Sequence, residues 1–225
     1  MTNPTILLDL DGTIADSRPG IIASLRAGLH DLGHTPDPNE DFTWAVGPPL
    51  PEVWGRLMAQ FGDDRVEFGM VRYREHYGLT GLYDATLFPG IADAIEALYL
   101  AGHELIVATA KRVDFARRLV ENLGLAHRFL SVYGSMPDGT LDDKADLIAD
   151  IMRRENLTAD AMVMVGDRSH DIHAAHANGV KAIGVAWGYG APGELAAAGA
   201  DVIIATPGEL LHDVYTVIDT RPTTA

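Results

Sequence analysis

Short apolar runs alternate with amphipathic segments along most of this chain, and this alternation constrains the fold more than any other feature. Five runs have the length and apolar content of buried strands, at residues 5–10, 103–108, 161–165, 180–185 and 202–205. Helical patterns lie between them, at residues 91–100, 114–123, 141–154 and 169–178. Strands that alternate with helices predict an α/β fold with a Rossmann-like parallel sheet, covered by helices on both faces.

One segment, residues 17–83, departs from this alternation because it contains no convincing strand. Helical patterns cover residues 21–32, 51–61 and 65–77, with Gly and Pro at the joints. We therefore predict an inserted α-helical cap domain at residues 17–84 and a core domain formed by residues 1–16 and 85–225. The two junctions are expected to lie close together and to serve as a hinge.

Composition argues against several classes of protein. The 225 residues include no cysteine, which excludes a disulfide scaffold and a thiol nucleophile. The net charge of −15 opposes non-specific nucleic-acid binding but still admits a small phosphorylated metabolite. No apolar run approaches the ~18 residues of a membrane span, and residues 1–10 lack the features of a signal peptide. We expect a cytoplasmic protein with a frayed tail at residues 220–225, and the sequence does not indicate an oligomeric state.

Polar residues follow the predicted strands at the edge where open parallel sheets bind their ligands. These residues are Asp9, Asp11 and Gly12 after the first strand, Thr109 and Ala110 after the second, and Asp167 after the third, with Asp171 one helical turn later. Carboxylates gathered at one edge repel one another, and a divalent cation relieves that repulsion. Magnesium suits such a site because it takes oxygen ligands and keeps several waters.

The same residues are suited to phosphoryl transfer. Asp9 and Asp11 are two residues apart on an extended segment, so both can point to one side, where one can attack phosphorus while the other handles protons. Lys144 lies in the first turn of a predicted helix, where a cation opposes the helix dipole, so we expect it to have another partner. Lys144 and the Thr109 hydroxyl can hold phosphate oxygens, and Gly12 leaves room for a backbone N–H to do the same.

Four segments, in order, resemble the motifs of the haloacid dehalogenase superfamily of hydrolases, and the resemblance covers nearly the whole chain. The segments run from Asp9 to Thr13, from Val107 to Lys111, from Asp142 to Ala145 and from Gly166 to Asp171. The resemblance implies that Asp9 is the nucleophile and Asp11 the general acid/base, with Lys144 as a further catalytic residue. It also implies substrate contacts from Gly12, Thr109 and Ala110, and Mg²⁺ held by the Asp9 side chain, the Asp11 carbonyl and Asp167, with Asp171 close by.

A finer resemblance is to the phosphoglycolate phosphatase-like branch. It is carried by Asp16-Ser17 followed by Gly20-Ile21, by the segment from Gly47 to Leu50, and by Arg168 with His170. Members of this branch dephosphorylate phosphoglycolate, nucleoside monophosphates or phosphotyrosine. The resemblance therefore implies a magnesium-dependent phosphatase that hydrolyses a small monoester, phosphoglycolate-like or a nucleoside monophosphate, through a phosphoaspartate. Ala110 departs from the serine that is more common in relatives, so a hydroxyl contact is missing there.

Several alternatives to a phosphatase stay open from the sequence. A phosphomutase on the same scaffold would return the phosphate to a sugar instead of water. Residues 188–193 match the G-x-G-x-x-G pattern of dinucleotide-binding modules, but the helix they should open, near 194–198, is too short, and the expected acid is absent. A non-catalytic interaction protein would leave the carboxylate cluster unexplained.

Other polar residues are expected to be structural. His170, His173 and His176 are spaced three apart, which fans them over a broad arc of a helix, unlike a zinc-binding pair. We expect His173 and His176 on an exposed face, and Arg18 and Arg56 at the surface.

Two further reactions of the superfamily fit the sequence poorly. The three lysines are Lys111, Lys144 and Lys181, so the insert offers none for the Schiff base of phosphonoacetaldehyde cleavage. The dehalogenases lack the second Asp of the first motif, whereas Asp11 is present here and can protonate an alkoxide leaving group.

Overall fold

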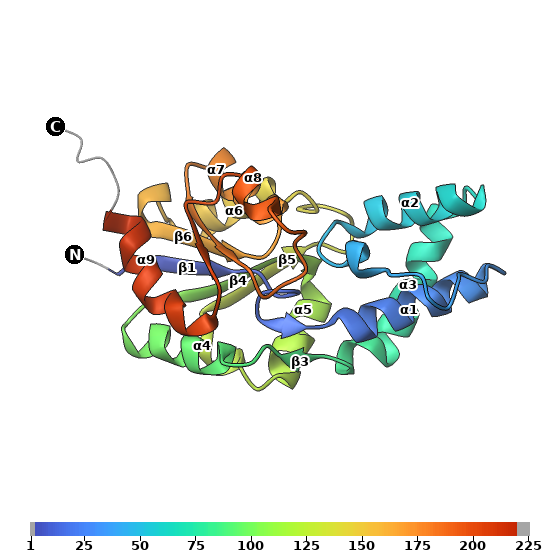
Figure 1. Cartoon of the computed structure of the whole chain (residues 1–225), viewed down its shortest axis with the longest axis horizontal. Helices are drawn as coiled ribbons and strands as arrows, with labels where there is room; N and C mark the ends of the chain where they lie inside the picture. Colours follow the sequence, from blue (N-terminus) through green and yellow to red (C-terminus); the bar gives the residue numbers. More distant parts are fainter. Residues whose placement is uncertain (1–2, 220–225) are drawn as a thin grey trace.

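The computed structural model describes residues 3–219 and consists of an α/β core with helices projecting from one end (Figure 1). The core is built on a six-stranded parallel sheet in the order β5-β4-β1-β6-β7-β8. The strands are β1 (Thr5–Leu8), β4 (Leu105–Arg112), β5 (Ser131–Ser135), β6 (Met162–Gly166), β7 (Lys181–Val185) and β8 (Val202–Ile204). The predicted α/β fold is confirmed, while the predicted tail at 220–225 lies outside the described residues.

Helices cover both faces of this sheet, as the apolar runs predict. Ile6 and Leu8 of β1 point into one hydrophobic cluster and Leu7 into the other, because successive side chains of a strand alternate between faces. The first cluster is completed by helices α4 (Ile91–Leu100), α5 (Val113–Asn122) and α9 (Leu210–Asp219), and the second by α6 (Lys144–Arg154), α7 (Ser169–Ala177) and the short α8 (Glu194–Ala197). None of the helices described in residues 3–219 is both long and apolar enough to cross a membrane.

The structure differs from the sequence prediction mainly at the edges of elements. Strand β5 was not predicted because its sequence, from Ser131 to Ser135, contains no sustained apolar run, and it occupies an edge of the sheet. Strand β4 continues beyond Ala108 to Arg112, with a shift in its register against β5 between Thr109 and Arg112. Strand β1 ends at Leu8 instead of residue 10, so Asp9 is the first residue beyond its carboxyl end.

The cap consists of helices α1 (Arg18–Asp31), α2 (Leu50–Phe61) and α3 (Val66–Leu79), with no strand within residues 17–83. The segments that enter and leave it lie side by side, because β2 (Ala15–Asp16) pairs with β3 (Thr86–Leu87) in an antiparallel ladder. The predicted proximity of the junctions is thus confirmed. Their action as a hinge, and the domain boundaries at 16/17 and 84/85, stay predictions.

Close approaches at glycine hold the cap helices together. The Trp54 ring of α2 is fully buried against α1 and α3, and a Cβ at Gly69 would lie 2.2 Å from Trp54 Cε3. At the base of the cap, a Cβ at Gly20 would lie 1.9 Å from the carbonyl oxygen of Gly81. Helix α1 therefore packs backbone to backbone against the segment that returns to the core.

This contact leads to a prediction about stability. Gly20→Ala should lower the free energy of unfolding by about 1–3 kcal/mol, because the new methyl group meets a backbone carbonyl that cannot rotate away. Chemical denaturation followed by circular dichroism measures this change. Gly55→Ala in α2 is the matched control, since its Cβ meets no atom within 4 Å, and it should stabilise by about 0.5–1 kcal/mol. Equal effects of the two substitutions would contradict the assigned role of the Gly20 contact.

Candidate active site

A buried lysine joins two carboxylates at the carboxyl end of the central strand. Asp9 follows β1 directly, and its backbone N–H donates to the Val165 carbonyl of β6 at 2.9 Å. Lys144 begins α6, where the side chain of Asp143 caps the helix, and its Nζ lies 2.6 Å from Asp9 Oδ1. The same ammonium donates to Asp171 Oδ1. Lys144 thus has the partners that its unfavourable position at a helix N-terminus led us to expect.

Opposing effects set the protonation of this lysine. Burial alone would lower the pKa of the Lys144 ammonium, but the neighbouring Asp171 and Asp9 carboxylates outweigh burial and raise that pKa. Lys144 therefore stays charged and supplies a fixed positive charge to the site.

Three buried carboxylates form a group that could hold a metal ion. Asp9, Asp167 and Asp171 each offer one oxygen, and these oxygens all lie within 4.8 Å of one another. Burial raises the pKa of Asp9 to about 7, opposed by Lys144 and reinforced by Asp171. Burial, followed by repulsion from Asp171 and Asp9, also raises the pKa of Asp167 well above its usual range. A divalent cation would offset both causes, and three carboxylate oxygens are ligands that a hard cation such as Mg²⁺ accepts.

Asp11 is not a member of this group and is held by other partners. Lys111 Nζ lies 2.9 Å from Asp11 Oδ2, and the Ser17 hydroxyl donates to Oδ1. Lys111 also donates to the hydroxyl of Tyr77 on the cap helix α3 at 2.9 Å. Lys111 therefore connects the Asp11 side chain to the cap helix α3. The predicted contact of the Asp11 carbonyl with a metal stays a prediction.

The three predicted substrate contacts lie near these carboxylates. Thr109 and Ala110 line the same cavity as Asp9 and Asp11, and the buried Thr109 hydroxyl accepts a hydrogen bond from the Lys111 backbone N–H at 3.2 Å. Gly12 has a φ of +93°, and a Cβ there would lie 2.2 Å from Asp167 Oδ2. Its N–H donates to the Ala15 carbonyl at 2.9 Å, and both the positive φ and the space taken by Asp167 require glycine at this position. The roles of these residues toward phosphate stay predictions.

The glycine-rich loop at residues 188–193 lies against the site. The Tyr189 backbone N–H donates to Asp167 Oδ2 at 2.7 Å, and a Cβ at Gly188 would lie 2.3 Å from the Cβ of Asp167. The helix that follows, α8, has only four residues. A dinucleotide-binding helix is thus absent from this position, and the loop instead orients Asp167, a member of the carboxylate group that could hold a metal ion.

Two segments of the finer resemblance meet across the interface of cap and core. Arg168 lies between Asp167 and α7, and its guanidinium donates to Glu194 at 3.0 Å and to the Val46 carbonyl at 2.5 Å. Gly47, the next residue, has a φ of +105°, and a Cβ there would lie 3.1 Å from the Arg168 guanidinium. Arg168 therefore ties the fourth motif to the cap loop, and its backbone N–H donates to Asp171 Oδ2 at 3.0 Å.

The residues expected at the surface are there. His170, His173 and His176 are exposed, and His176 pairs with Asp201 at 3.0 Å. The Arg56 guanidinium stacks on the Trp44 ring at 3.8 Å, and Arg18 is exposed near Asp16.

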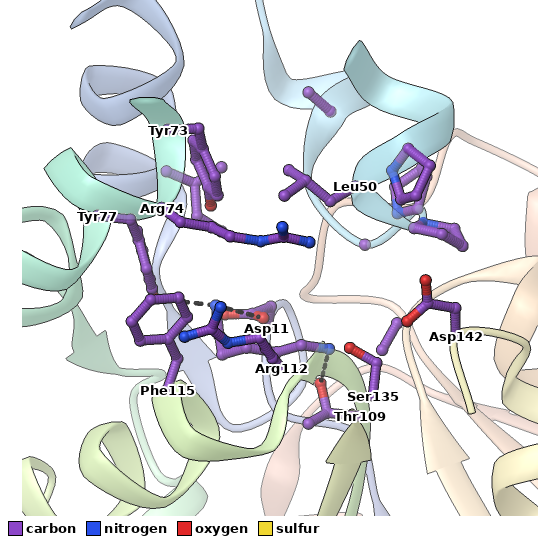
Figure 2. A pocket seen from close by; sticks show the side chains of 18 of the residues that line it. Asp11, Leu50, Tyr73, Arg74, Tyr77, Thr109, Arg112, Phe115, Ser135 and Asp142 are labelled. Atoms are coloured by element: carbon purple, nitrogen blue, oxygen red, sulfur yellow. Dashed lines mark hydrogen bonds and ion pairs between the residues drawn. The ribbon is translucent and has the colours of Figure 1, made fainter. Parts of the chain in front are cut away.

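The cavity between cap and core contains residues that the sequence did not single out. Tyr73, Arg74 and Tyr77 of α3 face it from the cap, opposite Asp11 and Thr109 of the core (Figure 2). The only sequence signal for them was their place in a helix of the insert. Their arrival at the site depends on how the cap sits over the sheet.

Comparisons with known proteins agree with this architecture. Residues 6–185 match the haloacid dehalogenase-like hydrolase family. The chain is similar to a 5′-nucleotidase of Pseudomonas aeruginosa, at 39% identity over 86% of this chain and 87% of that protein. It is also similar to the tyrosine-protein kinase PtkA of Mycobacterium tuberculosis, at 38% identity over 82% of this chain and 62% of that protein. A predicted phosphatase from Clostridium acetobutylicum has a structure that superposes with a TM-score of 0.88, at 31% identity over 96% of this chain and 100% of that one.

The carboxylate group leads to a prediction about pH. The folded pKa of Asp9, about 7, is above its ordinary value of 3.8, so the folded metal-free protein binds more protons than the unfolded chain between these values. Its free energy of unfolding should therefore fall by about 1–2 kcal/mol as pH rises from 6 to 8. Mg²⁺ would stabilise the ionised Asp9 carboxylate, which is more populated at pH 8. It should therefore raise the melting temperature more at pH 8 than at pH 6. Thermal denaturation with EDTA or Mg²⁺ measures both effects.

Asp9→Asn is the control for this pH dependence. It removes the titrating group, so the pH dependence of the metal-free protein should weaken. A metal-free wild type that gains stability between pH 6 and 8, or a Mg²⁺ effect of the same size at both pH values, would contradict the assignment.

Proposed function

The chain belongs to the haloacid dehalogenase-like hydrolase family and is a phosphatase of that family, and we propose that it hydrolyses a small phosphate monoester through a phosphoaspartate on Asp9. The observation that carries this proposal is the buried group formed by Asp9, Asp167 and Asp171 around Lys144. Such a group is costly to bury and has no packing function, whereas it matches the demands of phosphoryl transfer. The substrate is either phosphoglycolate-like or a nucleoside monophosphate.

Asp9 is the nucleophile in this proposal. One of its oxygens, Oδ1, is held by Lys144, and within residues 3–219 Oδ2 has no hydrogen-bond donor. Oδ2 is therefore the oxygen that attacks phosphorus, which breaks the bond to the ester oxygen and leaves the phosphoryl group on Asp9. Lys144 orients the attacking carboxylate and stabilises charge on the phosphoryl oxygens.

Asp11 handles the protons in this proposal. It gives a proton to the departing alkoxide and then takes one from the water that attacks the phosphoaspartate. Both Asp11 oxygens are occupied in this structure, by Lys111 and Ser17, so the carboxyl group must exchange one of these partners for the ester oxygen. Because Lys111 also contacts Tyr77, movement of the cap would change the position of Asp11.

Mg²⁺ is the proposed cofactor, held by Asp9, Asp167 and Asp171, and when bound it supplies positive charge that offsets the phosphate charge. The Asp167 carboxylate is fixed for this purpose by Tyr189 and by the glycines that surround it. No cysteine is present, and the exposed histidines lie outside the group, so the donor set favours a hard cation over zinc.

The acceptor in the second step distinguishes hydrolysis from transfer. A phosphomutase would pass the phosphate to a hydroxyl group instead of water. A tyrosine kinase, the activity in the name of the related PtkA, would also transfer phosphate to a hydroxyl group. The protonation of Lys111 disfavours Schiff-base chemistry, which needs a neutral amine. Burial would lower the pKa of this lysine, but Asp11, Tyr77 and Tyr73 raise it above the ordinary value, so it stays an ammonium and is a poor nucleophile.

Substitution of the two aspartates tests the mechanism. Asp9→Asn should abolish turnover of phosphate monoesters in the presence of Mg²⁺, because the amide cannot accept the phosphoryl group. Asp11→Asn should lower kcat by roughly 10²–10⁴-fold, the usual range for loss of a general acid/base. Steady-state release of inorganic phosphate measures both, and circular dichroism confirms that the variants fold. Full activity of the Asp9→Asn variant would refute the assignment of Asp9 as the nucleophile.

A panel of substrates tests the reaction class. Wild type with Mg²⁺ should release inorganic phosphate in a one-to-one ratio with consumed ester, and EDTA should remove this activity until Mg²⁺ is restored. Halide from 2-haloacids and acetaldehyde from phosphonoacetaldehyde should form more slowly than phosphate from esters, because Asp11 serves an alkoxide leaving group and the cap contains no lysine. Restoration by zinc alone, faster release of halide or acetaldehyde, or phosphate that appears on another hydroxyl would each overturn part of the proposal.

A further inference from the structure

One arginine in the cavity between cap and core lacks the carboxylate partner that its neighbours have. Arg74 projects from α3 into the cavity, across from Asp11 and Thr109 (Figure 2). In the part of the chain that the structure describes, its guanidinium makes no hydrogen bond and no ion pair. Burial, and repulsion from Arg112, lower the pKa of Arg74. The Asp142 and Asp114 carboxylates attract the guanidinium and partly offset these effects, but neither forms an ion pair with it.

The other cations of the cavity are all satisfied from within the protein. Arg112 donates to both oxygens of Asp114, at 2.5 and 2.6 Å, and its guanidinium lies over the Phe115 ring at 4.5 Å. Lys111 is paired with Asp11. Asp142 faces the same cavity but forms no ion pair with Arg74 within 4.0 Å. The missing partner of Arg74 is therefore left to a ligand.

The position of Arg74 determines which part of a substrate it would meet. The phosphoryl group must lie next to Asp9 and Lys144, at the carboxyl edge of the sheet. Arg74 comes from the cap side of the cavity, opposite that edge (Figure 2). A leaving group that extends from the phosphorus toward the cap would reach the guanidinium, whose planar set of donors matches a carboxylate or a second phosphate.

We propose that Arg74 forms a second anion subsite, so that the preferred substrates are small phosphate monoesters whose leaving group carries its own negative charge. This inference rests on the proposed ester hydrolysis at Asp9 and narrows its substrate class. It favours a phosphoglycolate-like ester over a nucleoside monophosphate, because a nucleoside leaving group is neutral. Arg74 is a specificity-determining residue and takes no part in bond breaking.

Two esters that differ only at the far end test the subsite. Phosphoglycolate ends in a carboxylate, and 2-hydroxyethyl phosphate ends in a neutral hydroxymethyl group of similar size. Wild type with Mg²⁺ should prefer phosphoglycolate. Arg74→Gln should lower kcat/KM for phosphoglycolate by about 10–100-fold, mostly through a higher KM. It should change kcat/KM for 2-hydroxyethyl phosphate by less than about 3-fold. Arg74→Lys should give an intermediate value, because it keeps the charge and loses the planar fork.

Arg56→Gln is the matched control, since it makes the same chemical change on the exposed surface of the same cap. This substitution should leave kcat/KM for both esters unchanged. An equal loss of activity toward both esters in Arg74→Gln would show a structural role and overturn the subsite. A preference of wild type for adenosine monophosphate that depends on Arg74 would also overturn it, since the guanidinium would then stack on a base.

A binding measurement separates failure of the subsite from failure of the proposed function. Calorimetry on Asp9→Asn with Mg²⁺ should show tighter binding of phosphoglycolate than of 2-hydroxyethyl phosphate, and Arg74→Gln in that background should remove the difference. If wild type hydrolyses neither ester, the proposed function fails, and this binding difference still decides the subsite. Equal binding of the two esters would overturn the subsite even where both are hydrolysed.

Discussion

The contact of Lys144 with Asp9 and Asp171 is the interaction on which the arrangement of the site depends. It joins the end of the central strand to the first turns of α6 and α7, three elements that are far apart in the sequence. Burial of like charges costs stability, and removal of one partner from a buried ion pair leaves the other uncompensated. Lys144 therefore does two things at once. It allows Asp9 and Asp171 to be buried together with Asp167, and in the proposed mechanism it places positive charge next to the phosphoryl group.

Asp11, the proposed proton-transfer group, and Asp9, the proposed nucleophile, are held by different lysines. Lys144 contacts only the core, so Asp9 is held whatever the cap does. Lys111 contacts both Asp11 and the cap residue Tyr77, so Asp11 depends on where the cap lies. In the proposed mechanism, this division keeps the nucleophile Asp9 in position at all times and lets the acid Asp11 act only on an enclosed substrate.

The sequence alone was sufficient for five of the six strands of the sheet, for helices α4 to α7 and for the group of aspartates. Apolar runs report burial directly, and the carboxyl ends of parallel strands converge at one edge, so Asp9 and Asp167 could be placed together without coordinates. Strand β5 was not predicted from the sequence, because an edge strand of mostly small and polar residues contains no apolar run. The partners of Lys111 and the position of Arg74 could not be foreseen, because both depend on packing between cap and core, which no local pattern encodes.

The overall charge of the protein makes these few cations matter more. With 32 acidic residues against 17 lysines and arginines, the long-range field repels an anionic ester. At physiological ionic strength that field is screened beyond about 8 Å, so repulsion acts mainly near the surface. Two of the three lysines are nevertheless buried at the site, each against a carboxylate. Their charges are largely neutralised by these carboxylates, so Arg74 is, in the proposed subsite, the cation that gains most from an anion. Selection of the substrate is thus expected to occur by contact within the cavity and not by steering toward it.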